Sequence, residues 1–194
     1  MEKLHVKDLI SVGIFSLLFI ALIFIVACFQ VLPILSVALP ILMALFSGPV
    51  YLLFVARTGK PFCITILGLL VSLIVGLLVF GNIYICLFNF VIFILAELVA
   101  SIGKYKSFKI NLLSYIVLSV WVFGEIGAYW IAKDWMRAKS IASGVDLEFV
   151  EKTFELSTTT NLLIVLVLTI ICAVISGLVS KSMFKKHFSR AGMI

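Results

Sequence analysis

Two carboxylates, Glu97 and Glu125, stand inside long apolar runs of this 194-residue sequence. A charge at the centre of a bilayer costs about 2.5 to 3.5 kcal/mol on insertion scales, so such a residue usually faces the interior of a helix bundle. Carboxylate, amide and aromatic groups together suit an amphipathic ligand. The sequence therefore predicts a substrate-binding pocket with eight members: Glu125, Asn89, Tyr84, Phe88, Tyr129, Trp130, Trp135 and Met136.

A second interpretation of the same residues stays open. Glu125 could be a protonated or bridged packing residue, with the neighbouring tryptophan and tyrosine side chains forming a belt at the membrane interface. Glu97 stands deeper, towards the opposite side of the membrane, and we expect a structural role for it.

The composition indicates an integral membrane protein. The chain is 64% hydrophobic and 12% charged, whereas soluble domains are about half apolar and a quarter charged. A single globular core of this length could not bury so much apolar surface. The net charge of +6 comes from basic residues dispersed between apolar runs, so we expect the lipid bilayer as a partner and no nucleic acid.

The elements that must position these residues are six apolar segments. Each has 19 to 23 residues, which is the length that a helix needs to cross about 30 Å of hydrocarbon. We therefore predict an all-α bundle of six transmembrane helices that forms one membrane domain over residues 1–194, with a kink at Gly48-Pro49. The predicted helices cover residues 8–28, 34–56, 62–80, 83–102, 110–132 and 160–180.

The basic residues predict the orientation. Eleven of the 15 lysines and arginines fall on the side of the two termini and four in the opposite long loop, residues 133–159. By the positive-inside rule both termini are cytoplasmic, in a bacterial plasma membrane. Within the loop, Leu147, Val150 and Phe154 share one face of an amphipathic helix, which could be a surface helix on the bilayer or a lid over an outward-facing pocket.

Motifs for catalysis are absent from the sequence. The histidines are His5 and His187, and no H-E-x-x-H, G-x-S-x-G or G-x-x-x-x-G-K-[ST] pattern occurs. The four cysteines have no metal-ligand spacing and are interpreted as packing residues. We expect no enzymatic activity, no metal site and no intrinsic cofactor, with any ATP hydrolysis carried out by partner subunits.

Small residues recur at helical spacing in two of the apolar segments. The third segment has Gly68, Ser72 and Gly76, and the sixth has the pairs Ala173/Gly177 and Ser176/Ser180. Such ridges let helix backbones approach closely in lipid. They could serve internal packing or form a docking face for another membrane subunit.

Two stretches resemble a known family: residues 48–60, GPVYLLFVARTGK, and residues 185–192, KKHFSRAG. With six spans in under 200 residues, they resemble the Trep_Strep, or MptD-type, group of substrate-binding (S) components of energy-coupling factor (ECF) transporters. The resemblance implies a six-helix bundle that captures a scarce nutrient at its outer end. It also implies docking on a transmembrane coupling (T) subunit driven by two cytoplasmic ATPases.

The resemblance has one departure and leaves the substrate open. Many such subunits carry an A-x-x-x-A pair on the first helix, where this chain offers Gly13, Ser16 and Ala21 as coupling-subunit docking residues. Haem is one candidate as transported ligand, held by methionine or tyrosine because both histidines lie on the cytoplasmic side. A carboxylated or cationic vitamin-like molecule is the other. Two rival functions are an ion-coupled carrier that uses Glu97 and Glu125 as a relay, and a non-transporting membrane scaffold.

Overall fold

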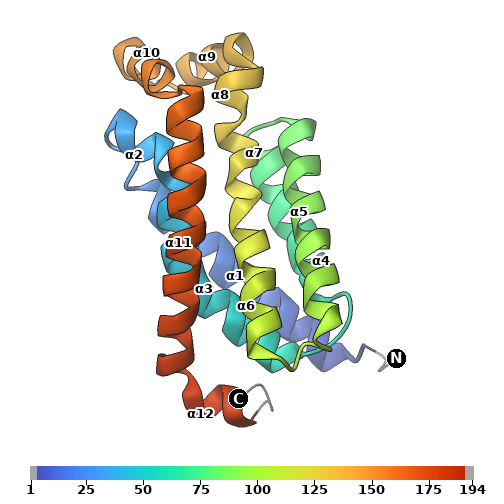
Figure 1. Cartoon of the computed structure of the whole chain (residues 1–194). Helices are drawn as coiled ribbons and strands as arrows, with labels where there is room; N and C mark the ends of the chain where they lie inside the picture. Colours follow the sequence, from blue (N-terminus) through green and yellow to red (C-terminus); the bar gives the residue numbers. More distant parts are fainter. Residues whose placement is uncertain (1–3, 191–194) are drawn as a thin grey trace.

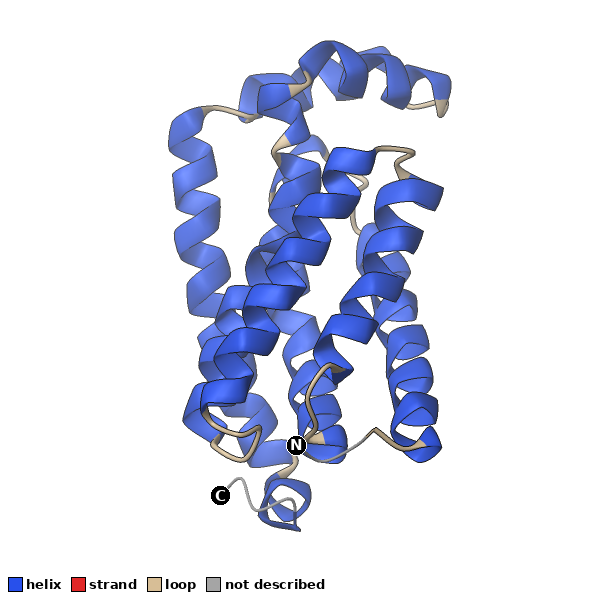
Figure 2. Ribbon diagram, turned by 90° about the vertical axis from the view of Figure 1, so that its right-hand side faces the viewer, coloured by secondary structure: helices blue, strands red, loops and turns tan. Residues whose placement is uncertain are grey.

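The computed structural model describes residues 4–190, without the side chains of His187 and Phe188, and throughout this part the regular elements are helices (Figures 1 and 2). Lys3, one of the eleven basic residues on the side of the termini, lies outside the described residues, as do Ala191 and Gly192 of the C-terminal motif. The prediction of an all-helical fold is confirmed.

Five helical stretches have the length and apolar character of a membrane span: Val6–Ala27 (α1), Leu39–Thr58 (α3), Ile83–Ile102 (α5), Phe108–Ile131 and Thr159–Met183 (α11). The third predicted segment is the shorter apolar helix Cys63–Val79, at most about 26 Å long at 1.5 Å per residue. Six crossings and the placement of the termini therefore stay predictions.

Two of the predicted segments are interrupted. The second is divided at Ala38 into α2 (Pro33–Val37) and α3. The fifth changes its winding twice and breaks once, at Gly127, so that its parts are α6 (Phe108–Leu118), the 3₁₀ helix η2 (Ser119–Val122), α7 (Phe123–Ile126) and α8 (Ala128–Ile131). The third also changes, from α4 (Cys63–Ser72) to a π-helix, η1 (Leu73–Val79).

The two ends of the bundle differ. At the capped end, α9 (Lys133–Ala142) and α10 (Leu147–Leu156) lie across the helices, while both termini and α12 (Lys185–Arg190) lie at the terminal end (Figure 1). The amphipathic helix predicted in the long loop is α10. Its first turn is capped by Asp146, which accepts a hydrogen bond from the Glu148 N–H at 3.1 Å.

Helix α3 continues through Pro49 because another helix satisfies the carbonyl that proline leaves free. Proline has no N–H to donate to the carbonyl four residues earlier, here that of Leu45. Ser176 of α11 donates its hydroxyl to this oxygen at 2.6 Å. Gly48 makes the approach possible, since a Cβ there would lie 2.3 Å from the Ser176 Oγ.

The small-residue ridges face the interior of the bundle. A Cβ on Gly68 would lie 2.2 Å from Phe93, one on Gly76 would lie 2.4 Å from the Cys86 Cα, and one on Gly177 would lie 2.2 Å from Leu112. These contacts place α4 and η1 against α5, and α11 against α6. Of the two functions open for the ridges, internal packing is confirmed at these three glycines.

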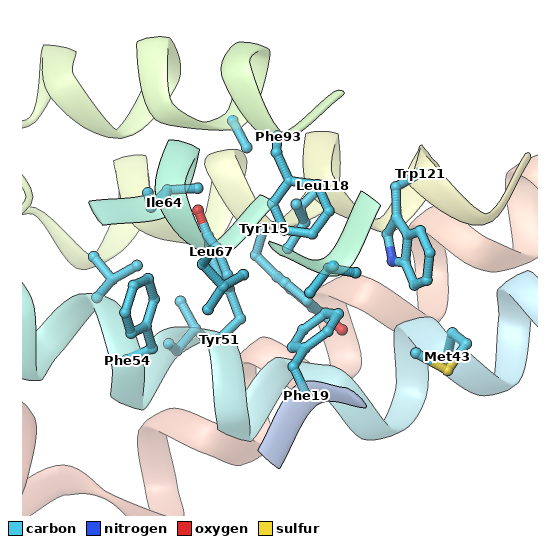
Figure 3. Close-up of a cluster of buried hydrophobic side chains, with 14 of the residues drawn as sticks. Phe19, Met43, Tyr51, Phe54, Ile64, Leu67, Phe93, Tyr115, Leu118 and Trp121 are labelled. Carbon is cyan, nitrogen blue, oxygen red and sulfur yellow. The ribbon is translucent and has the colours of Figure 1, made fainter. Parts of the chain in front are cut away.

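The main core extends along the bundle and is rich in aromatic side chains (Figure 3). The rings of Phe19, Phe93 and Trp121 lie with each pair of centroids 6.2 Å apart. Tyr51 and Tyr115 stack at 5.6 Å, and both hydroxyls form hydrogen bonds inside the bundle. Buried tyrosines normally need such partners, so the polar groups join the helices without opening a water-filled path.

Candidate ligand-binding site

Glu125 is a buried carboxylate that no protein group neutralises. Its side chain is 7% exposed, and within residues 4–190 no hydrogen bond or ion pair reaches it. Buried charges are usually paired, because an unpaired one loses its hydration without compensation. An unpaired buried carboxylate is therefore the strongest indication of a ligand site in this molecule.

The Glu125 side chain lines a cavity of about 120 Å³ inside the bundle. Aromatic rings form part of its wall, from Phe24 of α1, from Phe80 after η1 and from Trp121 of η2. Gln30, in the turn between α1 and α2, is the other polar side chain of the lining. The rest of the lining is aliphatic apart from Met43, so the side chains that can orient a ligand by charge or hydrogen bonding are Glu125, Gln30 and, through its indole N–H, Trp121.

Irregular helix segments surround this cavity. The π-helix η1 contributes Val75 and Val79, the 3₁₀ helix η2 contributes Trp121, and α3 contributes Leu39 immediately after its break from α2. In η1 the Phe80 N–H donates to the Val75 carbonyl at 3.0 Å, five residues earlier. π-Helical turns occur frequently at functional sites, and irregular backbone at membrane depth is tolerated where it is buried or lines a cavity.

Asn89 stabilises the wall of the cavity without lining it. Its side chain is fully buried on α5. With the amide nitrogen turned towards η2, it donates to the Trp121 carbonyl at 2.8 Å and to the Ile85 carbonyl at 3.2 Å. Gly124 leaves room for it, because a Cβ there would lie 2.5 Å from the end of the Asn89 carboxamide. Asn89 thus holds the 3₁₀ turn that carries Trp121, and it is not part of the cavity lining.

The other six predicted pocket residues, five aromatic side chains and one methionine, lie at three different places in the structure. Tyr84 is 78% exposed and Phe88 40% exposed, so both lie on the outside of α5. Trp130 packs against the main core, and its indole N–H is buried without a partner among the described groups. The remaining three predicted residues belong to a small cluster beneath the cap: Tyr129, Trp135 and Met136.

This cap cluster joins α8, α9 and α10. Tyr129 meets Phe154 edge-on, with ring centroids 5.4 Å apart. Met136 is 3% exposed and packs with Ile85 and Ala128. Of the eight predicted pocket residues, Glu125 therefore lines the cavity, Asn89 supports it, and Tyr129, Trp135 and Met136 build the cover at the same end of the bundle.

Several lining residues were missed by sequence reasoning. Trp121 stands four residues before Glu125, and this spacing on a helix could have placed the two on one face. Gln30 is a polar residue in an apolar turn and was also a usable signal. Phe24, Met43 and Phe80 carry no distinguishing pattern in so apolar a chain.

Glu97 has a different environment at the terminal end. It accepts hydrogen bonds from the N–H groups of Ile64 at 2.9 Å and Thr65 at 3.1 Å, in the first turn of α4. Tyr105 donates its hydroxyl to the other carboxylate oxygen. Burial and, second, this hydrogen bond raise the pKa of the Tyr105 phenol above its usual value. The structural role expected for Glu97 is confirmed: it caps α4 from the neighbouring helix.

A larger hollow, of about 600 Å³, opens beside Glu97 at the terminal end. Phe62, Lys104 and Tyr105 line it, and all three have positive φ angles, of 69°, 50° and 60°. Both Glu97 oxygens are already engaged by the protein, so this hollow offers no free carboxylate to a ligand. Glu125 is the better candidate for recognition.

The other expected sites have these positions. On α1, Ser16 is buried, Ala21 is exposed, and a Cβ added at Gly13 would meet nothing within 4 Å. Gly13 and Ala21 therefore belong to the open face of α1, and Ser16 to its packed face. The cysteines are free thiols, and the described residues contain no group of three metal-ligating side chains.

Fold and site together define the class: an all-helical integral membrane protein with a small, mainly apolar cavity beneath a helical cap. The sequence profile of Trep_Strep, described as a hypothetical bacterial integral membrane protein, matches residues 6–190. The chain belongs to this family. Comparisons with curated proteins and with solved structures found no match.

Proposed function

We propose that this protein is the substrate-binding S component of an ECF-type importer in a bacterial plasma membrane. In this role it captures a small nutrient or cofactor-like molecule in the Glu125 cavity. It then delivers the molecule through a coupling subunit driven by two partner ATPases. It has no enzymatic activity of its own, and both termini are cytoplasmic.

The observation that carries the proposal is the unpaired, buried carboxylate of Glu125 in a cavity beneath the cap. A protein with a purely structural role would gain no stability from an unpaired buried carboxylate. A ligand-binding pocket, in contrast, needs a few polar groups in an apolar lining. The cap helices α9 and α10 also fit the lid interpretation, since Tyr129 and Phe154 close over the same end of the bundle.

The size of the cavity favours a small substrate over haem. Pockets for drug-sized ligands have volumes of about 300 to 1,000 Å³, and this one has about 120 Å³. A haem macrocycle would need at least the larger range. Of the two candidate substrates, we therefore propose the vitamin-like molecule and not haem.

The rival ion-coupled carrier has less support. A proton relay between Glu97 and Glu125 would need both carboxylates to exchange protons during transport. Glu97 instead accepts hydrogen bonds from two backbone N–H groups and from Tyr105, so both of its oxygens are engaged in capping α4.

Purification of the tagged chain from its native membrane in mild detergent tests the proposal. We expect two nucleotide-binding subunits and one coupling subunit to co-purify, and the complex in vesicles to accumulate substrate only with ATP. Recovery of the chain alone, with uptake driven by a proton gradient, would favour the ion-coupled carrier. Absence of both uptake and partners would favour a membrane scaffold.

A further inference from the structure

We propose that the Glu125 cavity is selective for compact organic cations: a primary or secondary ammonium group on a small apolar body. The inference deepens the proposed function and rests on it for the role of the site in import. The juxtaposition that carries it is a buried carboxylate, without a protein partner, facing an aromatic cavity.

The charge of Glu125 determines which charge the ligand must carry. No lysine, arginine or histidine is among the residues that line the cavity, so the protein supplies no counter-ion to Glu125. A bound anion would lie beside a second buried negative charge, which is strongly unfavourable. A neutral ligand would leave the carboxylate without a charge partner. A ligand ammonium compensates the charge and donates hydrogen bonds to the carboxylate at the same time.

The remaining walls suit the same ligand. Phe24, Phe80 and Trp121 present aromatic surface, which binds both apolar groups and the positive edge of an alkylammonium. The Gln30 carboxamide offers an oxygen that accepts a second ammonium hydrogen. The aliphatic residues and Met43 complete a surface that favours carbon over water.

Volume sets the size of the cation. A cavity of about 150 Å³ lined by apolar side chains accommodates benzene, so the 120 Å³ present here suits a body of about five or six non-hydrogen atoms. The cyclopentylammonium ion has this size and is a suitable probe. Cyclopentanol is its uncharged isostere, and cyclopropanecarboxylate is an anion with the same number of non-hydrogen atoms.

The experiment measures binding of these three probes to the full-length protein in lipid nanodiscs by isothermal titration calorimetry at pH 7. We expect cyclopentylammonium to bind at least about 30-fold more tightly than cyclopentanol, as for loss of a buried charge pair, and cyclopropanecarboxylate not to bind. Equal affinity for amine and alcohol, tightest binding of the carboxylate, or no binding of any probe would each overturn the inference.

Two variants assign the selectivity to the carboxylate. Glu125→Gln has nearly the same shape, and we expect it to reduce amine affinity to that of the alcohol while leaving alcohol affinity unchanged. The matched control is Glu97→Gln, which removes the other intramembrane carboxylate and should leave amine affinity unchanged. An unchanged amine affinity in Glu125→Gln would overturn the inference, and the wild-type comparison decides it without any variant.

The test of the cation site can fail or succeed independently of the test of the proposed importer function. If the amine binds as expected but the purified chain has no ATPase partners, the cation site stands and the importer proposal fails. If ATP-driven uptake is observed but is insensitive to Glu125→Gln, the importer proposal stands and the cation site is wrong.

Discussion

The hydroxyl of Ser176 donates to the carbonyl of Leu45 at 2.6 Å, across the interface between α11 and α3. The carbonyl is free because Pro49, four residues later, has no N–H. The bond therefore satisfies a backbone group at the partly buried interface of two apolar helices, where lipid offers no hydrogen-bond partner. It joins two helices whose pairing is the most extensive in the fold.

Replacement of Ser176 by alanine should lower stability, because it leaves the Leu45 carbonyl without a hydrogen-bond partner at an apolar helix interface. The expected loss is about 1 to 3 kcal/mol, visible as a lower melting temperature in detergent by tryptophan fluorescence. Ser182→Ala is the matched control, since Ser182 is exposed on the same helix. Equal melting temperatures for the two variants would contradict the role assigned to Ser176.

Replacement by alanine should have different effects on stability at Gly76 and at Gly13. A Cβ at Gly76 would lie 2.4 Å from the Cys86 Cα, a backbone atom that cannot move aside, while a Cβ at Gly13 meets nothing within 4 Å. We expect Gly76→Ala to destabilise the protein by about 1 to 3 kcal/mol. Gly13→Ala should be neutral or stabilising by up to about 1 kcal/mol, from helix propensity. Similar unfolding curves would show that η1 and α5 are not so closely packed.

Substitution of Gly13 by leucine tests the open face of α1 as the docking surface. The isolated variant should keep the wild-type melting temperature, because the added side chain extends away from the bundle. Co-purification of the coupling subunit and ATPases should fall several-fold, since small residues permit close helix approach. Leu163→Ala, at an exposed position of α11, is the control for a general change of surface. Full retention of partners by Gly13→Leu would place docking elsewhere.

Loss of the Glu97 cap should reduce stability without changing ligand affinity. Glu97→Gln keeps one acceptor oxygen but removes the negative charge from the N-terminus of α4 and weakens the bond from Tyr105. We expect about 1 to 2 kcal/mol of destabilisation, measured by thermal unfolding. Glu155→Gln, an exposed carboxylate on α10, should have no measurable effect. A changed amine affinity in Glu97→Gln would show that the two carboxylates are coupled.

The raised pKa of Tyr105 predicts that the protein loses stability at high pH. Its pKa is raised in the folded protein, so the folded state holds the phenolic proton more tightly than the unfolded state. The resulting stabilisation is fully present below the unfolded pKa, about 10, and is lost as pH rises above it. Melting temperatures of wild type and Tyr105→Phe should therefore converge above about pH 10. A constant difference across the alkaline range would contradict this assignment.

The sequence by itself determined the positions of the long helices and the character of their ends. Residues 83–102 were predicted as a span and are α5. A turn at Gly81-Asn82 precedes α5, with φ of 65° at Gly81 and with Asn82 as the N-cap of the helix. Glu97 was expected to be structural. These features follow from local chemistry: apolar length, glycine conformational freedom and a polar cap are each encoded within a few residues.

Only the tertiary structure decided which side chains meet Glu125. Phe24, Gln30 and Phe80 come from separate elements, and in a chain with apolar residues on every helix face the hydrophobic pattern cannot show which face turns inward. The π-turns of η1 and the 3₁₀ turn of η2 rotate these faces further, because each changes the number of residues per turn. The cavity therefore results from helix rotation and packing, which no local pattern in the sequence records.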